Sequence, residues 1–402
     1  MSGTYFPLHT TLDQDGLKNS LAQNLQPPWK RYDCVDIQYE RQNLQSTKGL
    51  NFFQALKWSP SGGSIVVLTE NQKLTHWPIS TTKTDTNEPS LTFDNSGKNA
   101  ITPSECIYSF TWHPSRNNQK LDSDLIAFST RDYPIQIYSL SKQQRVSSFY
   151  VVDHCERFIG SHCMDFSPDG EYLIAGGTNN FYLFNVHLGQ KSPVSTTPTS
   201  GHEIPMWEPT LDGVQSSICL NPQDPRTMAL GTFNNTVGIY DIHRSRPCQL
   251  KFSLANGTGV THMRWSSDGY GLYVGSRRST QIEVWDIRYA QDMLYEIKGH
   301  NGDTNQRIVF DTLGHEGLVS GGTDGCVSIW KGSQLVEKEN VTNQRNITVA
   351  AVEKHPFDSS LFALCYGRRC DIMDDEDGFS SIEYWETPFS SLQLLGMENG
   401  LA

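Results

Sequence analysis

The chain has 402 residues, with 32 Lys and Arg against 44 Asp and Glu, so its formal net charge is −12. Plentiful aromatic residues and a charged fraction of only 19% exclude an intrinsically disordered chain. The negative net charge excludes a generally basic nucleic-acid coat. The sequence predicts no membrane span, because it has no run of 18 apolar residues, and no secretory signal, because its first residues are polar. Nine cysteines without a Cys-x-x-Cys pair indicate reduced thiols in an intracellular protein.

The first segment, residues 1–50, is polar and rich in Gln and Asn, and we expect most of it to be mobile. Residues 34–39 alternate like a strand and can supply the outer strand of a sheet. From Phe53 to Trp385 one unit then recurs. It consists of an apolar strand, a Ser-Pro or His-Pro turn, a strand ending in small residues, a polar turn, and an alternating strand that closes on an aromatic residue. The closing aromatics are Trp77, Tyr138, Phe184, Tyr240, Trp285, Trp330 and Trp385.

These seven units predict an all-β fold, a seven-bladed β-propeller over residues 51–390 that folds as one domain. A four-stranded blade takes about 40–45 residues, and the longer units then carry loop insertions. Period-2 alternation supports strands, and closing the ring leaves no long open edge. Residues 187–213, rich in Ser, Thr and Pro, are predicted to be such an insertion, and residues 391–402 a short C-terminal tail.

One unit carries a more specific mark around Gly299-His300. Ser320, Asp324 and Trp330 follow at the spacing of the hydrogen-bonded tetrad of WD40 propellers, which this set resembles. In that tetrad the histidine bridges the turn aspartate to the serine and tryptophan. We therefore assign His300 a structural role.

No enzyme signature is found along the chain. It contains no Gly-rich phosphate cradle that opens a helix, and His154-Cys155 and His162-Cys163 come closest to a metal-ligand pair. The acidic stretch 371–377 does not match a calcium loop and is interpreted as a solvated turn. We predict a non-enzymatic binding platform without metal or cofactor. A catalytic propeller is a third and weaker alternative.

Arginines concentrate on one predicted face of the ring. In a WD40 blade the turn between the second and third strands shares a face with the link into the next blade. The link tetrapeptide Thr-Asn-Gln-Arg occurs twice, ending at Arg307 and at Arg345, and His262 begins an innermost strand near the same mouth. The residues predicted to bind RNA are Arg131, His262, Arg277, Arg278, Asn305, Gln306, Arg307 and Arg345.

These residue types suit recognition of single-stranded RNA. The planar guanidinium of arginine meets phosphate in a bidentate fashion and stacks on bases, and amides read base edges. Tyr133, Phe233 and Trp207 are candidates for base stacking. The alternatives are that the aromatics only pack and that the arginines pair with the acidic stretch 371–377.

Four stretches carry a resemblance to a known family. They are Asn51-Phe-Phe-Gln-Ala-Leu-Lys-Trp58-Ser-Pro60, Ser129-Thr-Arg-Asp-Tyr-Pro-Ile-Gln-Ile-Tyr138, Val260 through Arg277-Arg278 to Arg288, and Thr304-Asn-Gln-Arg-Ile308 with Val319-Ser-Gly-Gly322. They resemble the telomerase Cajal body protein family of WD40 propellers and its spliceosome-associated fungal relatives. The resemblance implies a nuclear scaffold that binds small Cajal body RNA or telomerase RNA and aids assembly and localisation of ribonucleoproteins. For the fungal relatives it implies pre-mRNA splicing. Positions carried over are Arg131, His262, Arg277, Asn305, Gln306 and Arg307.

The sequence therefore predicts a nuclear, monomeric scaffold whose partners are a small non-coding RNA or snRNP and nuclear ribonucleoprotein proteins. The alternative is a protein-only adaptor in a spliceosome-associated or ubiquitin-ligase assembly. The position of the charges reconciles RNA binding with the net charge. Residues 301–402 hold 16 Asp and Glu against 7 Lys and Arg, whereas residues 221–300 hold 9 Lys and Arg against 7 Asp and Glu.

Overall fold

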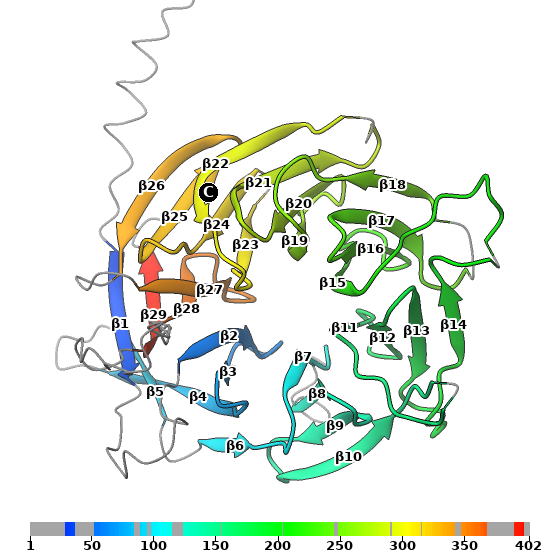
Figure 1. The fold of residues 1–402 in the computed structure, drawn as a ribbon. Helices are drawn as coiled ribbons and strands as arrows, with labels where there is room; N and C mark the ends of the chain where they lie inside the picture. Colours follow the sequence, from blue (N-terminus) through cyan, green and yellow to red (C-terminus); the bar gives the residue numbers. More distant parts are fainter. Residues whose placement is uncertain are drawn as a thin grey trace, which may run out of the picture.

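The computed structural model describes residues 29–36, 52–83, 89–94, 98–114, 124–153, 155–202, 204–244, 248–289, 292–314, 316–341, 347–367 and 390–397. These residues form strands, turns and loops, and none of them belongs to a helix that could cross a membrane. The strands make seven antiparallel sheets, which we call blades 1 to 7. Figure 1 shows the blades arranged as a ring with one strand of each facing the centre. The all-β propeller predicted from the repeat is thereby confirmed.

Within each blade the strands follow one another outward from the centre. Blade 1 holds β2 (Phe53–Trp58), β3 (Ser64–Thr69), β4 (Leu74–Lys83) and β5 (Pro89–Phe93), with β6 (Asn99–Ile101) also paired to β4. Blade 2 holds β7 (Ile107–Trp112), β8 (Leu125–Thr130), β9 (Ile135–Ser139) and β10 (Gln144–Phe149), and blade 3 holds β11 (Cys163–Phe166), β12 (Tyr172–Gly176), β13 (Asn180–Asn185) and β14 (Ser195–Pro198). Blade 4 holds β15 (Gln215–Leu220), β16 (Thr227–Thr232), β17 (Thr236–Asp241) and β18 (Leu250–Ser253).

The remaining blades repeat this order. Blade 5 holds β19 (Val260–Trp265), β20 (Gly271–Ser276), β21 (Ser279–Asp286) and β22 (Tyr295–Gly302), and blade 6 holds β23 (Phe310–Leu313), β24 (Gly317–Ser320), β25 (Cys326–Lys331) and β26 (Gln334–Asn340). Blade 7 holds β27 (Thr348–Lys354), β28 (Leu361–Gly367), β29 (Ser390–Met397) and, outermost, β1 (Trp29–Asp36).

Blade 7 joins the two ends of the chain. β1 pairs antiparallel with β29, from Trp29 opposite Met397 to Asp36 opposite Ser391. An outer strand is thus present in the N-terminal segment, but it begins at Trp29 rather than at residue 34. The expected C-terminal tail is wrong in its bounds, because residues 391–397 are part of the third strand of this blade. The strand expected at 382–385 lies outside the described residues.

The Ser, Thr and Pro-rich segment at 187–213 also differs from expectation. Ser195–Pro198 pairs with β13 and forms the outer strand of blade 3, so only part of this segment is an irregular loop. The proline stands at the last residue of this edge strand, where its missing N–H is tolerated.

The hydrophobic core lies between neighbouring blades. One buried cluster joins Trp58 and Ile65 of blade 1 to Leu361 and Ala363 of blade 7, and similar clusters join blades 2 and 3 and blades 4 and 5. Each fully buried Val, Leu, Ile or Phe side chain contributes about 1.5–3 kcal/mol. No blade can bury these side chains alone, so the blades stabilise one another as a ring.

Tryptophans at the ends of innermost strands tie each of three blades to the preceding one. The indole N–H of each donates to a backbone carbonyl on the preceding innermost strand. The bonds are Trp58 Nε1 to Glu353 O (3.0 Å), Trp112 Nε1 to Lys57 O (3.1 Å) and Trp265 Nε1 to Cys219 O (3.1 Å). These bonds fix the spacing of the innermost strands around the centre.

A second set of inter-blade bonds lies in the turns that follow the innermost strands. A His or Asn before the turn proline hydrogen-bonds to the carbonyl of a glycine in the next blade's turn. The pairs are His113 with Gly170 (3.1 Å), Asn221 with Gly269 (2.8 Å) and His355 with Gly62 (3.2 Å). Gly170 shows why glycine is needed, because its φ is +76° and an added Cβ would lie 2.6 Å from the His113 ring.

We expect Gly170→Ala to lower the free energy of unfolding by about 2–4 kcal/mol, because it combines left-handed strain with a steric conflict. Gly189→Ala is the matched control, since Gly189 also has a positive φ (+68°) but an added Cβ would meet nothing within 4 Å. Urea unfolding monitored by tryptophan fluorescence provides both values. In a His113→Ala background the cost of Gly170→Ala should fall to that of the control. An unchanged cost there would contradict the inter-blade contact.

Candidate nucleic-acid interface

The turn of blade 5 that carries two arginines lies against the link into blade 6. Arg278, with a positive φ of 51°, follows β20, and its backbone N–H donates to Thr304 O at 3.0 Å. Its side-chain Nε donates to Asn305 Oδ1 at 3.1 Å. The structure therefore brings together Arg278 and the Thr304–Arg307 link. We call this side of the ring the Arg face.

A row of ring contacts crosses blades 2 to 5 on this face. Tyr108 of blade 2 stacks on His162, with ring centroids 4.2 Å apart and planes inclined by 23°. The His162 ring meets Phe233 edge-on at 6.3 Å, and the guanidinium of Arg277 lies 3.8 Å from the Phe233 ring centroid. Each member comes from a different blade or the link before it, so the row depends on the packing of neighbouring blades. Together with Arg307 these residues form what we call the channel mouth.

Arg307 reaches from the link before blade 6 across to blade 4. Its Nη2 donates to Ser216 O at 2.8 Å, and desolvation lowers the pKa of its guanidinium. His162 has a lowered pKa because of desolvation first and the charges of Arg307 and Arg277 second. The mouth therefore holds two guanidinium groups beside a neutral imidazole.

His262 lies deeper, on the innermost strand of blade 5. Its Nε2 is 3.0 Å from Phe310 O, and its ring meets the Phe310 ring edge-on at 4.8 Å. Desolvation, followed by the charges of Arg264 and Arg307, lowers its pKa well below the usual 6.5. A neutral His262 donating to that carbonyl is held in place and joins blades 5 and 6.

A cavity of about 320 Å³ runs inward from the mouth. Tyr108, Gln306 and Arg307 line it at the Arg face, and His262 lines its wall. Lys57, Asp165, Arg264 and Glu353 also line it. Its volume falls at the lower end of the range of about 300–1,000 Å³ that is typical of small-ligand sites.

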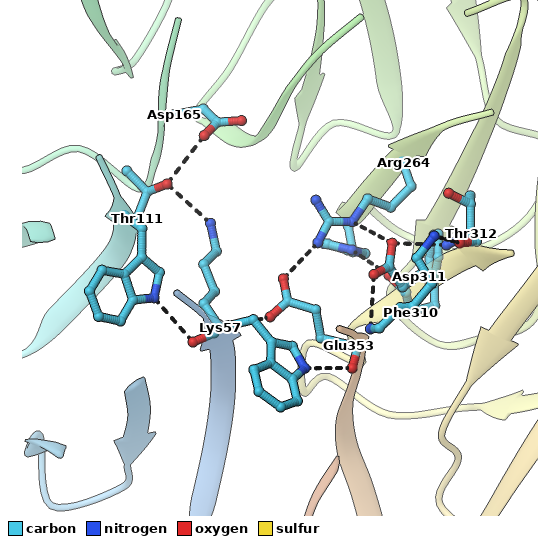
Figure 2. A network of polar contacts seen from close by, with 12 residues as sticks. Lys57, Thr111, Asp165, Arg264, Phe310, Asp311, Thr312 and Glu353 are labelled. Carbon is cyan, nitrogen blue, oxygen red and sulfur yellow. Dashed lines mark hydrogen bonds and ion pairs between the residues drawn. The ribbon is translucent and has the colours of Figure 1, made fainter. Parts of the chain in front are cut away.

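A ring of polar side chains surrounds the inner end of this cavity, and sequence reasoning missed it. Figure 2 shows these side chains converging from different blades. They are Lys57, Thr111, Asp165, Arg264, Asp311 and Glu353, and we call them the channel floor. Five of them stand directly before the last residue of their innermost strand, and Asp311 is the second residue of β23. A signal was present in the sequence, since a charged residue precedes the strand-ending aromatic in Lys57-Trp58, Asp165-Phe166 and Arg264-Trp265.

Arg264 is held between two carboxylates of the floor. Its Nη2 is 3.1 Å from Glu353 Oε1 and its Nε is 3.5 Å from Asp311 Oδ1. Desolvation alone would lower the pKa of Arg264, but these carboxylates outweigh it and raise the pKa above its usual value. Desolvation raises the pKa of Glu353 to about 7, although Arg264 opposes this shift.

The other half of the floor is less completely paired. Lys57 Nζ is 3.4 Å from Thr111 Oγ1, which is long for a hydrogen bond, and that hydroxyl donates to Asp165 Oδ1 at 3.2 Å. Desolvation lowers the pKa of Lys57, with Asp165 opposing. Both ends of this chain face the cavity.

Other predicted residues lie apart from this assembly. Arg131 forms a pair with Asp132 in its own turn (3.6 Å) and is 61% exposed, and Tyr133 beside it is 45% exposed. Trp207 is 85% exposed on the loop before blade 4. Arg345 lies outside the described residues. Of the three predicted stacking residues, Phe233 alone takes part in the row of rings described above.

The predicted tetrad is only partly formed. His300 is buried, and its Nδ1 lies 3.1 Å from Ser320 Oγ, as expected. The Trp330 indole instead donates to Lys298 O at 3.2 Å. Asp324 accepts from Asn301 Nδ2 at 2.7 Å and pairs with Lys338 Nζ at 2.6 Å, so it faces a neighbouring side chain and the outer strand. The expectation of a complete four-membered chain through His300 is therefore wrong.

Metal binding finds no support in the described ranges, where no three His, Cys, Asp and Glu side chains are grouped to hold an ion. Cys163 is buried, and its Sγ donates to Gln215 O at 3.2 Å. His162, its neighbour, stacks on Tyr108 instead.

The fold and the repeat define a WD40-repeat β-propeller. A family profile described as "WD domain, G-beta repeat" matches residues 150–185, which span the link into blade 3 and its first three strands.

Relatives narrow this class. The chain is 43% identical over 355 residues to Guanine nucleotide-binding protein negative regulator 1 of Schizosaccharomyces pombe, covering 87% of this chain and 89% of that protein. It is 27% identical to Telomerase Cajal body protein 1 of Bos taurus, covering 88% of this chain and 64% of that protein, and 22% identical to Protein SWT21 of Vanderwaltozyma polyspora, covering 91% and 90%. The chain belongs to the WD40-repeat family that contains these proteins. It spans about half to two thirds of the length of the telomerase Cajal body proteins that it matches.

We expect His300 to make stability depend on pH. Burial lowers its pKa to about 4, whereas the unfolded chain titrates near 6.5, so between these values the unfolded state binds the extra proton. This contribution, on the order of 3 kcal/mol, is complete above pH 6.5 and is lost as the pH falls towards 4. Urea unfolding at pH 7.5 and 5 should show a smaller loss for His300→Gln than for the wild type, with exposed His187→Gln behaving like the wild type. Equal losses in all three proteins would refute this assignment.

Proposed function

We propose that the chain is a non-enzymatic nuclear scaffold that binds a small non-coding RNA through the channel mouth of a seven-bladed propeller. The observation that carries the proposal is the row from Tyr108 through His162 and Phe233 to Arg277. Aromatic rings next to a guanidinium group are the kind of surface on which unpaired bases stack, at about 1–3 kcal/mol per base. Arg307 stands beside this row to meet a phosphate.

Charge distribution supports selective rather than general RNA binding. The whole chain is acidic, with a net charge of −12, so long-range attraction to a polyanion is weak. Short-range contacts from Arg277, Arg278 and Arg307 then decide which RNA stays bound. Because few phosphates are neutralised, the affinity should fall only moderately as salt is raised.

The names of the relatives support a setting in ribonucleoproteins. The name of Telomerase Cajal body protein 1 refers to telomerase, a ribonucleoprotein enzyme, and to the Cajal body, a nuclear compartment. We therefore propose that the chain acts in the nucleus, as a monomer within small-RNA particles of the telomerase RNA, Cajal body RNA or snRNP type. It would aid their assembly, localisation or part in pre-mRNA splicing.

A protein-only adaptor in a spliceosome-associated or ubiquitin-ligase assembly is the second candidate, and a surface on blade 5 favours it. Arg288 is held by Asp286 at 2.6 and 2.9 Å, and its guanidinium lies 4.3 Å from the Tyr270 ring centroid. Tyr289 beside it is 76% exposed. Tyr and Arg dominate the energetic centres of protein interfaces. Since this cluster follows the first and third strands of its blade, it lies opposite the Arg face, and both functions can coexist.

We expect Arg277→Ala combined with Arg307→Ala to reduce ultraviolet crosslinking of RNA to the full chain in cells by at least tenfold. The pair removes the cation from the row and the guanidinium beside it, while the aromatic packing remains. Arg244→Ala is the matched control, because Arg244 pairs with Asp241 in a turn away from the mouth. Sequencing of the crosslinked RNA gives its identity.

Melting temperatures within about 2 °C of the wild type show that any loss of crosslinking is local. If the double variant is as stable as the wild type and still crosslinks RNA equally well, the proposal of RNA binding at this site is wrong. Partners that are recovered equally well after RNase treatment, without any crosslinked RNA, would establish the protein-only adaptor in its place.

A further inference from the structure

The inner end of the cavity presents a donor and an acceptor side by side. Lys57 Nζ and Asp165 Oδ1 lie on either side of the Thr111 hydroxyl oxygen, at 3.4 and 3.2 Å. Among the described residues Asp165 accepts both of its hydrogen bonds at Oδ1, the second from Phe166 N at 3.0 Å. Figure 2 shows the other carboxylate oxygen turned away from Thr111. The ammonium group, with its single long contact in this part of the chain, also retains donor capacity.

One cavity connects this pair with the channel mouth. Lys57 and Asp165 line it at the floor, and Tyr108 and Arg307 line it at the Arg face. Its walls include Phe110 and other apolar side chains of the innermost strands. A flat apolar group that enters from the mouth would lose water against these walls and reach the polar pair with its edge.

The balance of charge decides which end of a nucleotide enters. The floor holds Lys57 and Arg264 against three carboxylates, two of which already pair with Arg264. A phosphate would therefore be repelled at the floor. The mouth offers Arg277 and Arg307 instead, and the histidine there is neutral because its pKa is lowered. The phosphate belongs at the mouth and the base belongs inside.

The donor and acceptor at the floor match the Watson–Crick edge of guanine. That edge presents the O6 acceptor next to the N1–H and N2–H donors, so Lys57 can donate to O6 while Asp165 accepts from N1–H and N2–H. Adenine has an amino group where guanine has O6, and this group would face the ammonium. Enzymes that read an extruded base use the same means, namely hydrogen bonds to this edge within a fitted pocket.

We propose that the channel accepts one extruded guanine nucleotide of the bound RNA, with its base edge on Lys57 and Asp165 and its phosphate at Arg307. The proposal rests on the RNA-binding function above and specifies how that site distinguishes one base. Stacking on the row at the mouth is tolerant of sequence. The floor then supplies selectivity at a single position.

Titration calorimetry of the full chain with guanosine 5′-monophosphate, adenosine 5′-monophosphate and inorganic phosphate tests the proposal. We expect the guanine nucleotide to bind at least tenfold more tightly than the adenine nucleotide, since a bidentate pairing discriminates by about that factor or more. Asp165→Asn and Lys57→Met should each abolish the preference. Exposed Lys142→Met, in a turn of blade 2, is the control and should retain it.

Equal affinities for the two nucleotides in the wild type would overturn the guanine site, as would a preference that survives both substitutions. Melting curves show whether either variant is unfolded. In that case the competition of the two nucleotides against a single-stranded RNA on the wild-type protein decides alone. RNA crosslinking reports separately on the proposed function: RNA that crosslinks at Arg277 and Arg307 without guanine selectivity removes only this inference. The absence of any crosslinked RNA, with a protein partner recovered instead, removes the proposed function as well.

Discussion

The hydrogen bond from a strand-ending tryptophan to the preceding innermost strand is the contact on which the site depends. Trp58 bridges blade 1 to blade 7 through Glu353 O, and Trp112 bridges blade 2 to blade 1 through Lys57 O. A buried indole N–H needs an acceptor, and for these tryptophans a backbone carbonyl of the neighbouring blade supplies it. The tryptophans therefore fix how far apart the innermost strands stand and how wide the channel is.

Two residues take part both in the inter-blade hydrogen bonds and in the polar lining of the channel. Lys57 and Glu353 offer their carbonyls to the indoles, while their side chains project into the cavity because successive side chains of a strand alternate. Glu353 also accepts from Trp58 N at 2.6 Å. Desolvating charges here costs stability, as the lowered pKa of Lys57 and the raised pKa of Glu353 show. Charges kept at such a cost, and only partly paired, are typical of a site rather than of a core.

The local sequence pattern of each repeat predicted most strands of the blades. The features that it did not predict depend on contacts between segments that are distant in the sequence. The strands from Phe53 to Tyr366 follow the apolar and small-residue pattern of each repeat. The pairing of Trp29–Asp36 with Ser390–Met397 depends on two segments more than 350 residues apart, which no local pattern specifies. The contact of Arg278 with Asn305 could be anticipated, since turn and link share a face in every blade. The floor was missed although a charge precedes several strand-ending aromatics, because each such charge stands alone in its own apolar strand until the ring brings its counterparts together.

Burial separates the two ends of the channel chemically. At the mouth and along the channel wall, desolvation and the neighbouring guanidinium groups lower the pKa of His162 and His262, so arginine supplies the positive charge there at neutral pH. At the floor, Glu353 has a pKa of about 7 and gains a proton as the pH falls through that value, while Arg264 stays charged. The floor therefore loses negative charge as the pH falls through about 7. A ligand with a phosphate at one end and a neutral, hydrogen-bonding edge at the other meets a complementary surface at both.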